Sequence, residues 1–207
     1  MQGRRHYRVW SFSGKSGGNC FVIFSKQLPA NAYGKAGRNF PEFTVLTQLK
    51  GPWSVAFDPK WGGPEEVEFP GLISWTDCTE DGIKFYSGKA IYRKTFDLSY
   101  KSDERLFLDL GNVSHVAEVM LNGKKLGILW CAPWRVDISG TAKSAGNTLE
   151  IAVTNIWANR VIGGLSLPKE KRFTTTHDAF RFDMLREGTP LIESGLLGPV
   201  RILKGSL

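Results

Sequence analysis

The sequence predicts an all-β protein whose antiparallel strands form a sandwich or a barrel. Apolar residues mostly recur with a period of two, which is typical of strands that bury one face. The 23 glycines and 10 prolines are spread along the 207 residues rather than gathered in one block, which indicates many turns. Strands at short spacing, with turn residues between them and little helical periodicity, are the pattern of antiparallel sandwiches and barrels.

The strand pattern recurs along the chain and is bounded by turn residues. A strand is expected at residues 20–26, 43–49, 53–58, 90–98, 105–111, 115–122, 125–130, 134–139, 147–155 and 199–205. Asn122 and Gly123 predict a two-residue hairpin between two of these strands, because both central positions of such a turn need a positive φ.

Two long segments interrupt this pattern. Residues 59–88 lack regular alternation. Residues 156–198 are expected to form a long loop with at most one helical turn, near residues 179–186. An ordered loop of this length in a compact domain usually has a function.

Composition argues against several classes of protein. The net charge of +7 is expected to be a solvated positive surface, and because no nucleic-acid-binding motif accompanies it, a nucleic-acid partner is not expected. Cys20, Cys78 and Cys131 allow at most one disulfide and form no C-x-x-C pair, which argues against a zinc site. Cys131 is expected to be a small buried apolar residue. The sequence starts without the apolar segment of a signal peptide, and no apolar run is long enough to span a membrane.

Several short motifs occur together between residues 121 and 202. They read LNG at 121–123, GILW at 127–130, PWRVDI at 133–138, GNTLEIAVTN at 146–155, WANRVIG at 157–163 and SGLLGPVRI at 194–202. Together they are similar to the jelly-roll sugar-binding domain of family 2 glycoside hydrolases. They resemble still more the C-terminal domain of family 106 alpha-L-rhamnosidases and their relatives. The resemblance covers residues 51–203 and implies a jelly-roll antiparallel β-sandwich of the galactose-binding-like type, without the catalytic barrel of those enzymes.

The same resemblance implies a domain organisation and a function. Residues 1–45 are expected to be a strand segment left from a preceding domain, and residues 46–207 to be the carbohydrate-binding-like domain. The expected function is that of a non-catalytic carbohydrate-binding or ancillary module of a glycoside hydrolase that degrades plant polysaccharides. The expected partners are a polysaccharide or oligosaccharide, and either a catalytic domain or a second copy of the chain.

Location and cofactors follow from the resemblance as well. Enzymes of this type act in the periplasm or outside the cell. No cofactor is expected, although jelly-roll modules often hold one structural calcium ion. Calcium needs six to eight oxygen ligands, and because no contiguous acidic loop is present we assign none.

Residue types suited to sugars occur where neighbouring strands end. An aromatic ring offers a flat apolar face to the C–H groups of a sugar, while amide and guanidinium groups bond its hydroxyls. The predicted ligand-binding residues are Trp130, Asn155, Trp157, Asn159, Arg160 and Tyr86. As alternatives, the asparagines would stabilise turns, and Arg160 would pair with an acid and anchor the long loop. Trp134 opens a strand with Val136 and Ile138 on its face, so it is expected to point inward.

The alternative function is that of a small stand-alone glycoside hydrolase. This reaction normally uses two carboxylates that lie about 5 to 9.5 Å apart. The candidate catalytic residues are His177, Asp178, Asp183 and Glu193. None of them lies in a catalytic motif, and the sequence has no G-x-S-x-G nucleophile motif.

Overall fold

The computed structural model describes residues 41–173 and 188–206, and the fold given below concerns these residues alone. The strand predicted at 20–26, the helical turn near 179–186 and the candidates His177, Asp178 and Asp183 lie outside the described residues. The boundary predicted between residues 45 and 46 falls inside the first strand, β1 (Glu42–Gln48), which pairs along its length with the last strand. Residues 42–45 therefore belong to the sandwich, and the origin of residues 1–40 stays a prediction.

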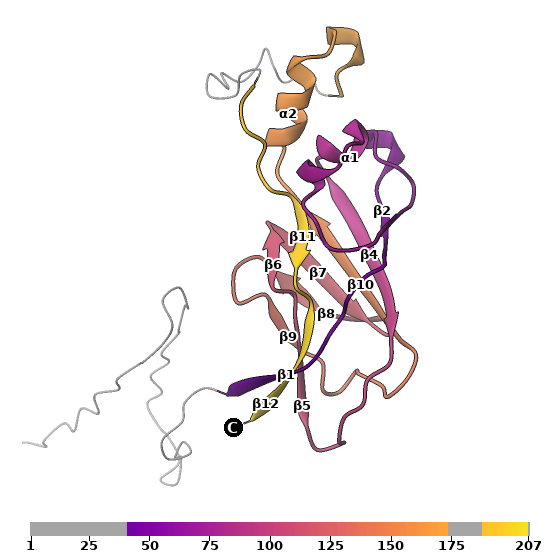
Figure 1. The fold of residues 1–207 in the computed structure, drawn as a ribbon, viewed down its shortest axis with the longest axis vertical. Coiled ribbons are helices and arrows are strands. Elements are labelled where there is room, and N and C mark those ends of the chain that lie inside the picture. The colour runs from indigo at the N-terminus through magenta and orange to yellow at the C-terminus, as the bar shows by residue number, and fades with distance from the viewer. Residues whose placement is uncertain (1–40, 174–187, 207) are drawn as a thin grey trace, which may run out of the picture. The chain divides into compact units, whose positions relative to one another are not determined.

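The described residues form a sandwich of antiparallel sheets (Figure 1). The larger sheet has six strands in the order β3 (Val67–Phe69), β2 (Trp53–Ala56), β4 (Lys89–Phe96), β10 (Asn147–Thr154), β7 (Val116–Leu121) and β8 (Lys124–Leu129). The second sheet has four, in the order β1, β12 (Arg201–Ser206), β5 (Arg105–Asp109) and β9 (Arg135–Asp137). A small sheet pairs β11 (Gly195–Gly198) with β6 (Asn112–Ser114). The predicted all-β sandwich is confirmed.

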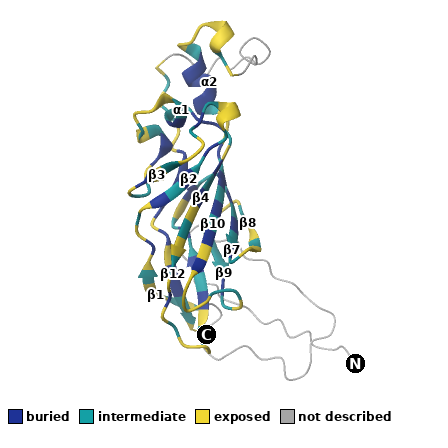
Figure 2. Ribbon diagram, turned by 90° about the vertical axis from the view of Figure 1, so that its right-hand side faces the viewer, coloured by how far each residue is buried: buried dark blue, intermediate teal, exposed yellow. Residues whose placement is uncertain are grey.

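One hydrophobic core takes side chains from both large sheets. Alternate residues of the central strands point into it, for example Ile151 from β10 and Leu108 from β5. Figure 2 shows this alternation as a change of colour along β10. Burial of each such side chain contributes roughly 1.5–3 kcal/mol to folding. Trp53 and Trp75 are fully buried in this core, and Trp134 packs against it, as its place on the strand predicts.

The predicted hairpin at Asn122 and Gly123 joins β7 to β8. Asn122 has a φ of 52° and Gly123 a φ of 78°, which are the positive values that this turn requires. The side chain of Asn122 also ties the turn to β10: its Nδ2 donates to the carbonyl of Thr141 at 2.7 Å, and its Oδ1 accepts from the N–H of Thr148 at 2.9 Å. The turn that joins β7 to β8 is therefore also hydrogen-bonded to β10 and to Thr141, which precedes β10.

Regular structure also lies where the sequence predicts none. The first irregular segment contains β3, the 3-10 helices η1 (Pro59–Trp61) and η2 (Trp75–Asp77), and the single-turn helix α1 (Asp81–Lys84). The second contains the helix α2 (Ala158–Leu165), the 3-10 helix η3 (Lys169–Lys171) and β11. Across the described part of the chain, no helix is long and apolar enough to cross a membrane.

Helix α2 forms because of tertiary packing rather than helix propensity. Gly163, Gly164 and the β-branched residues beside them are weak helix formers, so local sequence disfavours a helix here. A Cβ atom at Gly163 would lie 2.4 Å from Cγ of Phe85, the residue that follows α1. Glycine at this position therefore lets α2 pack closely on Phe85, and Figure 1 shows both helices at the same end of the sandwich.

The two described cysteines differ in environment. Cys131 is exposed, so the expectation that it is buried is wrong. The reason is its place in the connection from β8 to β9, where the chain passes from one sheet to the other at the edge of the sandwich. Cys78 is half-buried; burial raises the pKa of its thiol, and the carboxylates of Asp77 and Glu80 add to the effect.

We expect Cys131 to react with iodoacetamide about tenfold faster than Cys78 at pH 7.5, because only the accessible thiolate is a good nucleophile. Brief labelling, followed by mass spectrometry of the separate cysteine peptides, measures both rates in one sample. A Cys131→Ser variant should lose the fast label and leave the slow label at Cys78 unchanged. Equal rates at the two positions would contradict this prediction.

Candidate functional site

Two exposed tryptophans lie side by side at the end of the sandwich that carries α1 and α2. Trp157 directly precedes α2 and is 57% exposed, and Trp61 ends η1 and is 39% exposed. Their ring centroids are 6.3 Å apart and the ring planes are tilted by 59°. Aromatic rings at this separation are in contact. We call these two residues the tryptophan pair; it offers apolar ring surface to a ligand.

A buried network of polar side chains fixes the start of α2. Asn155 donates from Nδ2 to the carbonyl of Tyr86 at 2.9 Å and to Oγ of Ser194 at 3.2 Å. Asn159 donates from Nδ2 to the carbonyl of Ile192 at 2.7 Å and to the same Ser194 Oγ at 3.0 Å. The N–H of Ile192 returns a bond to Oδ1 of Asn159 at 2.8 Å. Because these buried groups are paired, the network holds α2 and the chain before β11 together without leaving orphaned amides.

The guanidinium of Arg160 lies between two aromatic rings. Its central carbon is 4.6 Å from the ring centroid of Phe173 and 5.7 Å from that of Tyr86, which is cation–π geometry. Its Nη2 donates a hydrogen bond to the carbonyl of Trp61. Burial lowers the pKa of Arg160. Arg160 is therefore bound to the backbone at Trp61, and within residues 41–173 and 188–206 the predicted acid partner is not found.

Tyr86 is a core residue. It is almost completely buried, and its ring packs edge-on against Phe57 and Trp75 at 4.9 and 5.6 Å. Its hydroxyl donates to the carbonyl of Lys89 at 3.0 Å and accepts from the N–H of Asp58 at 3.1 Å. Burial raises the pKa of this hydroxyl. Tyr86 is therefore part of the core that underlies the tryptophan pair. The expectation that it contacts a ligand does not fit its burial.

The predicted ligand-binding residues thus divide by burial. The buried, supporting residues are Tyr86, Asn155, Asn159 and Arg160, and the exposed ones are Trp130 and Trp157. Trp130 follows β8 and is 72% exposed. The register places Leu129 opposite Ala117 and Ala117 opposite Val153, so β8 and β10 end at the same edge, about 10 Å apart. The two strand ends gather as expected, but Trp130 forms no ring contact with the tryptophan pair in the described residues.

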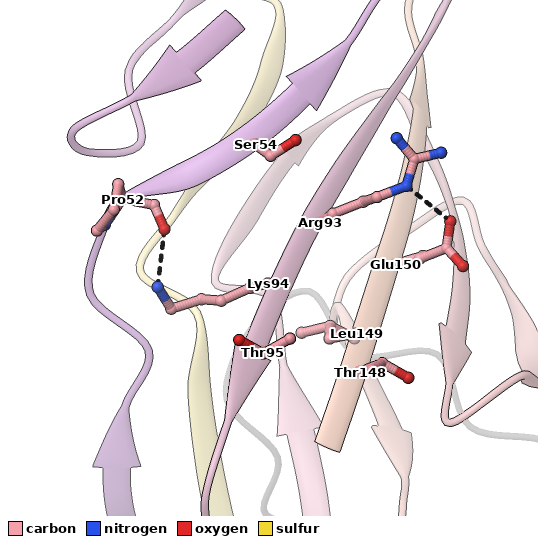
Figure 3. Close-up of a pocket in the computed structure, with 8 residues that line it drawn as sticks. All are labelled: Pro52, Ser54, Arg93, Lys94, Thr95, Thr148, Leu149 and Glu150. Carbon is pink, nitrogen blue, oxygen red and sulfur yellow. Dashed lines mark hydrogen bonds and ion pairs between the residues drawn. The ribbon is translucent and has the colours of Figure 1, made fainter. Parts of the chain in front are cut away.

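A shallow groove of about 570 Å³ lies on the outer face of the six-stranded sheet (Figure 3). Its lining residues are Pro52, Ser54, Arg93, Lys94, Thr95, Thr148, Leu149 and Glu150. Its charged side chains already have partners: Arg93 Nε lies 3.1 Å from Glu150 Oε2, and Lys94 Nζ donates to the carbonyl of Pro52 at 2.8 Å. None of the lining side chains is aromatic, so the groove suits a sugar less well than the tryptophan pair does.

Two described carboxylates, those of Glu104 and Glu118, lack the raised pKa of a general acid. Hydrogen bonds from Lys204 and Lys125 lower the pKa of Glu104 and of Glu118 respectively, whereas a general acid needs a raised pKa. The candidate Glu193 is exposed, and its backbone carbonyl accepts from Ser114 Oγ at 2.6 Å. The described ranges hold no group of three or more His, Cys, Asp or Glu side chains that would bind a metal. The calcium ion stays a prediction.

Residues 76–173 match the family described as glycosyl hydrolase 2 galactose-binding domain-like. This part of the chain is a galactose-binding-like domain of glycoside hydrolases. The resemblance that the sequence motifs indicate is confirmed, and the described residues form no barrel of alternating strands and helices.

Three relatives show how far the likeness of the galactose-binding-like domain extends. The chain is 40% identical over 179 residues to the "Putative beta-glucuronidase" of Formosa agariphila, across 74% of this chain and 15% of that protein. It is 35% identical to the rhamnosidase from Novosphingobium sp. PP1Y, with a TM-score of 0.73 across 85% of this chain and 16% of that one. The beta-glucuronidase of Ruminococcus gnavus, at 21% identity and a TM-score of 0.55, shares the fold and spans 81% of this chain and 28% of that one. The chain therefore spans a small part of each relative.

Sequence reasoning missed two parts of the site of the galactose-binding-like domain. Trp61 lies in a segment without alternation, and its only signal is an aromatic residue between Pro59 and the Gly62-Gly63 turn. Ser194 joins the two asparagines from a position far along the chain, and nothing local in the sequence indicates that role. Both residues act through contacts between distant segments, which periodicity does not reveal.

Proposed function

We propose that this galactose-binding-like domain is an ancillary carbohydrate-binding module of a glycoside hydrolase, and that a sugar ring stacks on its tryptophan pair. The observation that supports this most is the pairing of Trp61 and Trp157, which are exposed although the residues that position them are buried. A rigid, exposed aromatic surface meets the need of sugar binding, because little side-chain freedom is lost when a ligand stacks on it.

The surroundings of the tryptophan pair support the same proposal. Ile156, Phe173 and Ile192 are also large, exposed apolar residues, and each is adjacent to α2 in sequence or through a contact with Asn159 or Arg160. Clusters of exposed apolar side chains mark binding surfaces. The names of two relatives, a rhamnosidase and a beta-glucuronidase, are those of enzymes that act on sugars. A plant polysaccharide as ligand and a catalytic domain as neighbour are parts of this proposal.

Replacing Trp157 by alanine should weaken polysaccharide binding about tenfold, because the variant loses one stacking face. Trp61→Ala should have a similar effect. Val45, on the other sheet, is also 57% exposed, so Val45→Ala is a matched control for the loss of a surface apolar group and should bind as the wild type does. Affinity electrophoresis against a panel of soluble plant polysaccharides measures all three.

Unchanged binding by both tryptophan variants would contradict the proposal. The alternative of a stand-alone hydrolase is tested on the same preparation with aryl-glycosides. Turnover that disappears in Glu193→Gln would favour the hydrolase over the binding module.

A further inference from the structure

Three strands of the six-stranded sheet run in the same direction and end at the same edge of that sheet. They are β2, β10 and β8, which alternate in the sheet with the oppositely directed β4 and β7. The register places Ala56, Ala152 and Ile128, one from each of these strands, in a single row across the sheet. Neighbouring strands lie about 4.8 Å apart, so the three strands leave the sheet at intervals of about 10 Å.

Each of these three strands is followed by an exposed tryptophan. Trp61 comes five residues after the end of β2, Trp157 three residues after the end of β10, and Trp130 directly after β8. The core contains or contacts the other tryptophans of the described residues, which are Trp53, Trp75 and Trp134. Exposed apolar residues scattered singly are common on proteins, but here every exposed tryptophan of the described ranges lies along one sheet edge.

The surface between the tryptophan pair and Trp130 is low and largely apolar. Thr154 at the end of β10 lies opposite Val116 at the start of β7, and both side chains are half-buried. Ile156 beside the tryptophan pair and Ile128 on β8 add exposed apolar area. A ligand that contacts both the tryptophan pair and Trp130 crosses the spacing of two strands, about 10 Å, which one sugar ring does not span and a short chain of sugars does.

We propose that this sheet edge binds a glycan chain of several sugar residues, with one ring on the tryptophan pair and another, further along the same chain, on Trp130. This inference rests on the proposed binding of sugar at the tryptophan pair. Once one ring is bound, contact with Trp130 becomes an intramolecular step, so a chain that reaches both sites binds more tightly than one that reaches a single site. Stacking uses the apolar face of a ring and no particular hydroxyl group, so the edge selects for the length of the glycan.

The test measures affinity as a function of glycan length. Size-sorted fragments of xylan, galactan and rhamnogalacturonan, from about two to about ten sugar residues, are titrated into the full chain by calorimetry. We expect fragments long enough to reach Trp130 to bind at least about tenfold more tightly than the shortest fragments, with little further gain beyond that length. Binding at the tryptophan pair alone would give no such step, because the number of ways to place a longer fragment on one site rises only in proportion to its length.

Trp130→Ala should remove this step, leaving a preference for long fragments below about threefold, while the shortest fragments bind within about twofold of the wild type. Trp130 is largely exposed, so the substitution leaves the core untouched. Trp130→Phe keeps a flat ring and should retain most of the step. Val45→Ala removes an exposed apolar group from the other sheet and should behave as the wild type does.

The outcomes separate this inference from the proposed function. Equal affinity of the wild type for short and long fragments overturns the inference without any variant and leaves sugar binding at the tryptophan pair intact. A step that survives Trp130→Ala also overturns it, and so does a loss in that variant that is the same at every length. If no fragment binds, or if Trp61→Ala and Trp157→Ala leave the binding of every fragment unchanged, the proposed function is wrong and the inference falls with it.

Discussion

The substitution of Gly111 by alanine is expected to lower the free energy of unfolding by about 3 kcal/mol or more. Gly111 has a φ of 70°, a left-handed conformation that side chains with a Cβ disfavour. A Cβ at this position would lie 2.4 Å from both the carbonyl carbon and the carbonyl oxygen of Gly198, which bridges to Gly111. The obstacle is backbone, so no side-chain rotation relieves the clash.

Gly123→Ala is the matched control for this prediction. Gly123 has a similar φ of 78°, but a Cβ there would meet nothing within 4 Å. Gly123→Ala should therefore lower the free energy of unfolding by only about 1 kcal/mol, which is the strain of a positive φ at an alanine. Urea unfolding followed by fluorescence gives the free energy of both variants. Equal destabilisation by Gly111→Ala and Gly123→Ala would show that the clash with the backbone of Gly198 is not the cause of the destabilisation.

Asn155→Ala is expected to lower the free energy of unfolding by about 2–4 kcal/mol, because it removes three hydrogen bonds at once, two of them buried. The Nδ2 bonds to Tyr86 and Ser194 are lost, and the N–H of Gly88 loses its acceptor, Oδ1, at 2.9 Å. Two backbone groups are then left without partners inside the protein. The free energy of unfolding in urea measures the loss.

Asn112→Ala controls for the loss of an asparagine as such. Asn112 is exposed on β6, so its substitution should change the free energy of unfolding by less than about 0.5 kcal/mol. Asn155 lies two residues before Trp157, so the Asn155 variant should also weaken sugar binding even though its side chain is buried. A loss of stability below about 1 kcal/mol would contradict the supporting role of the network.

Strands with clear alternation were predictable because burial of one face imposes it. β7 and β10 bury every second residue, β4 does so over its first half, and all three lie where the sequence predicts them. β3, β6 and β11 have three or four residues each, too few for a period of two to show. Helix α2 was hidden for a different reason: its glycines serve packing against Phe85, which is a property of the fold and not of the segment.

The candidate site was predictable in residue type but not in role. The motif that contains Asn155, Trp157, Asn159 and Arg160 indicates sugar chemistry, and the residues do gather at one end of the sandwich. Sequence does not separate the exposed ring of Trp157 from the buried amides that support it, because both follow the same strand. The difference between exposed and buried residues arises from contacts with Trp61 and Ser194, which lie in distant parts of the sequence.

The contacts that position the tryptophan pair join residues far apart in the sequence, which bears on the order in which the domain folds. Arg160 and Trp61 are 99 residues apart, and Ser74 and Ser194, which bond each other, are 120 apart, whereas the β7–β8 hairpin joins neighbours. Distant contacts form slowly, because the chain between them must first lose its freedom. We therefore expect the hairpin to form early and the tryptophan pair to be assembled among the last steps. A chain still in synthesis would present no such surface, so the proposed sugar binding would begin only when the domain is complete.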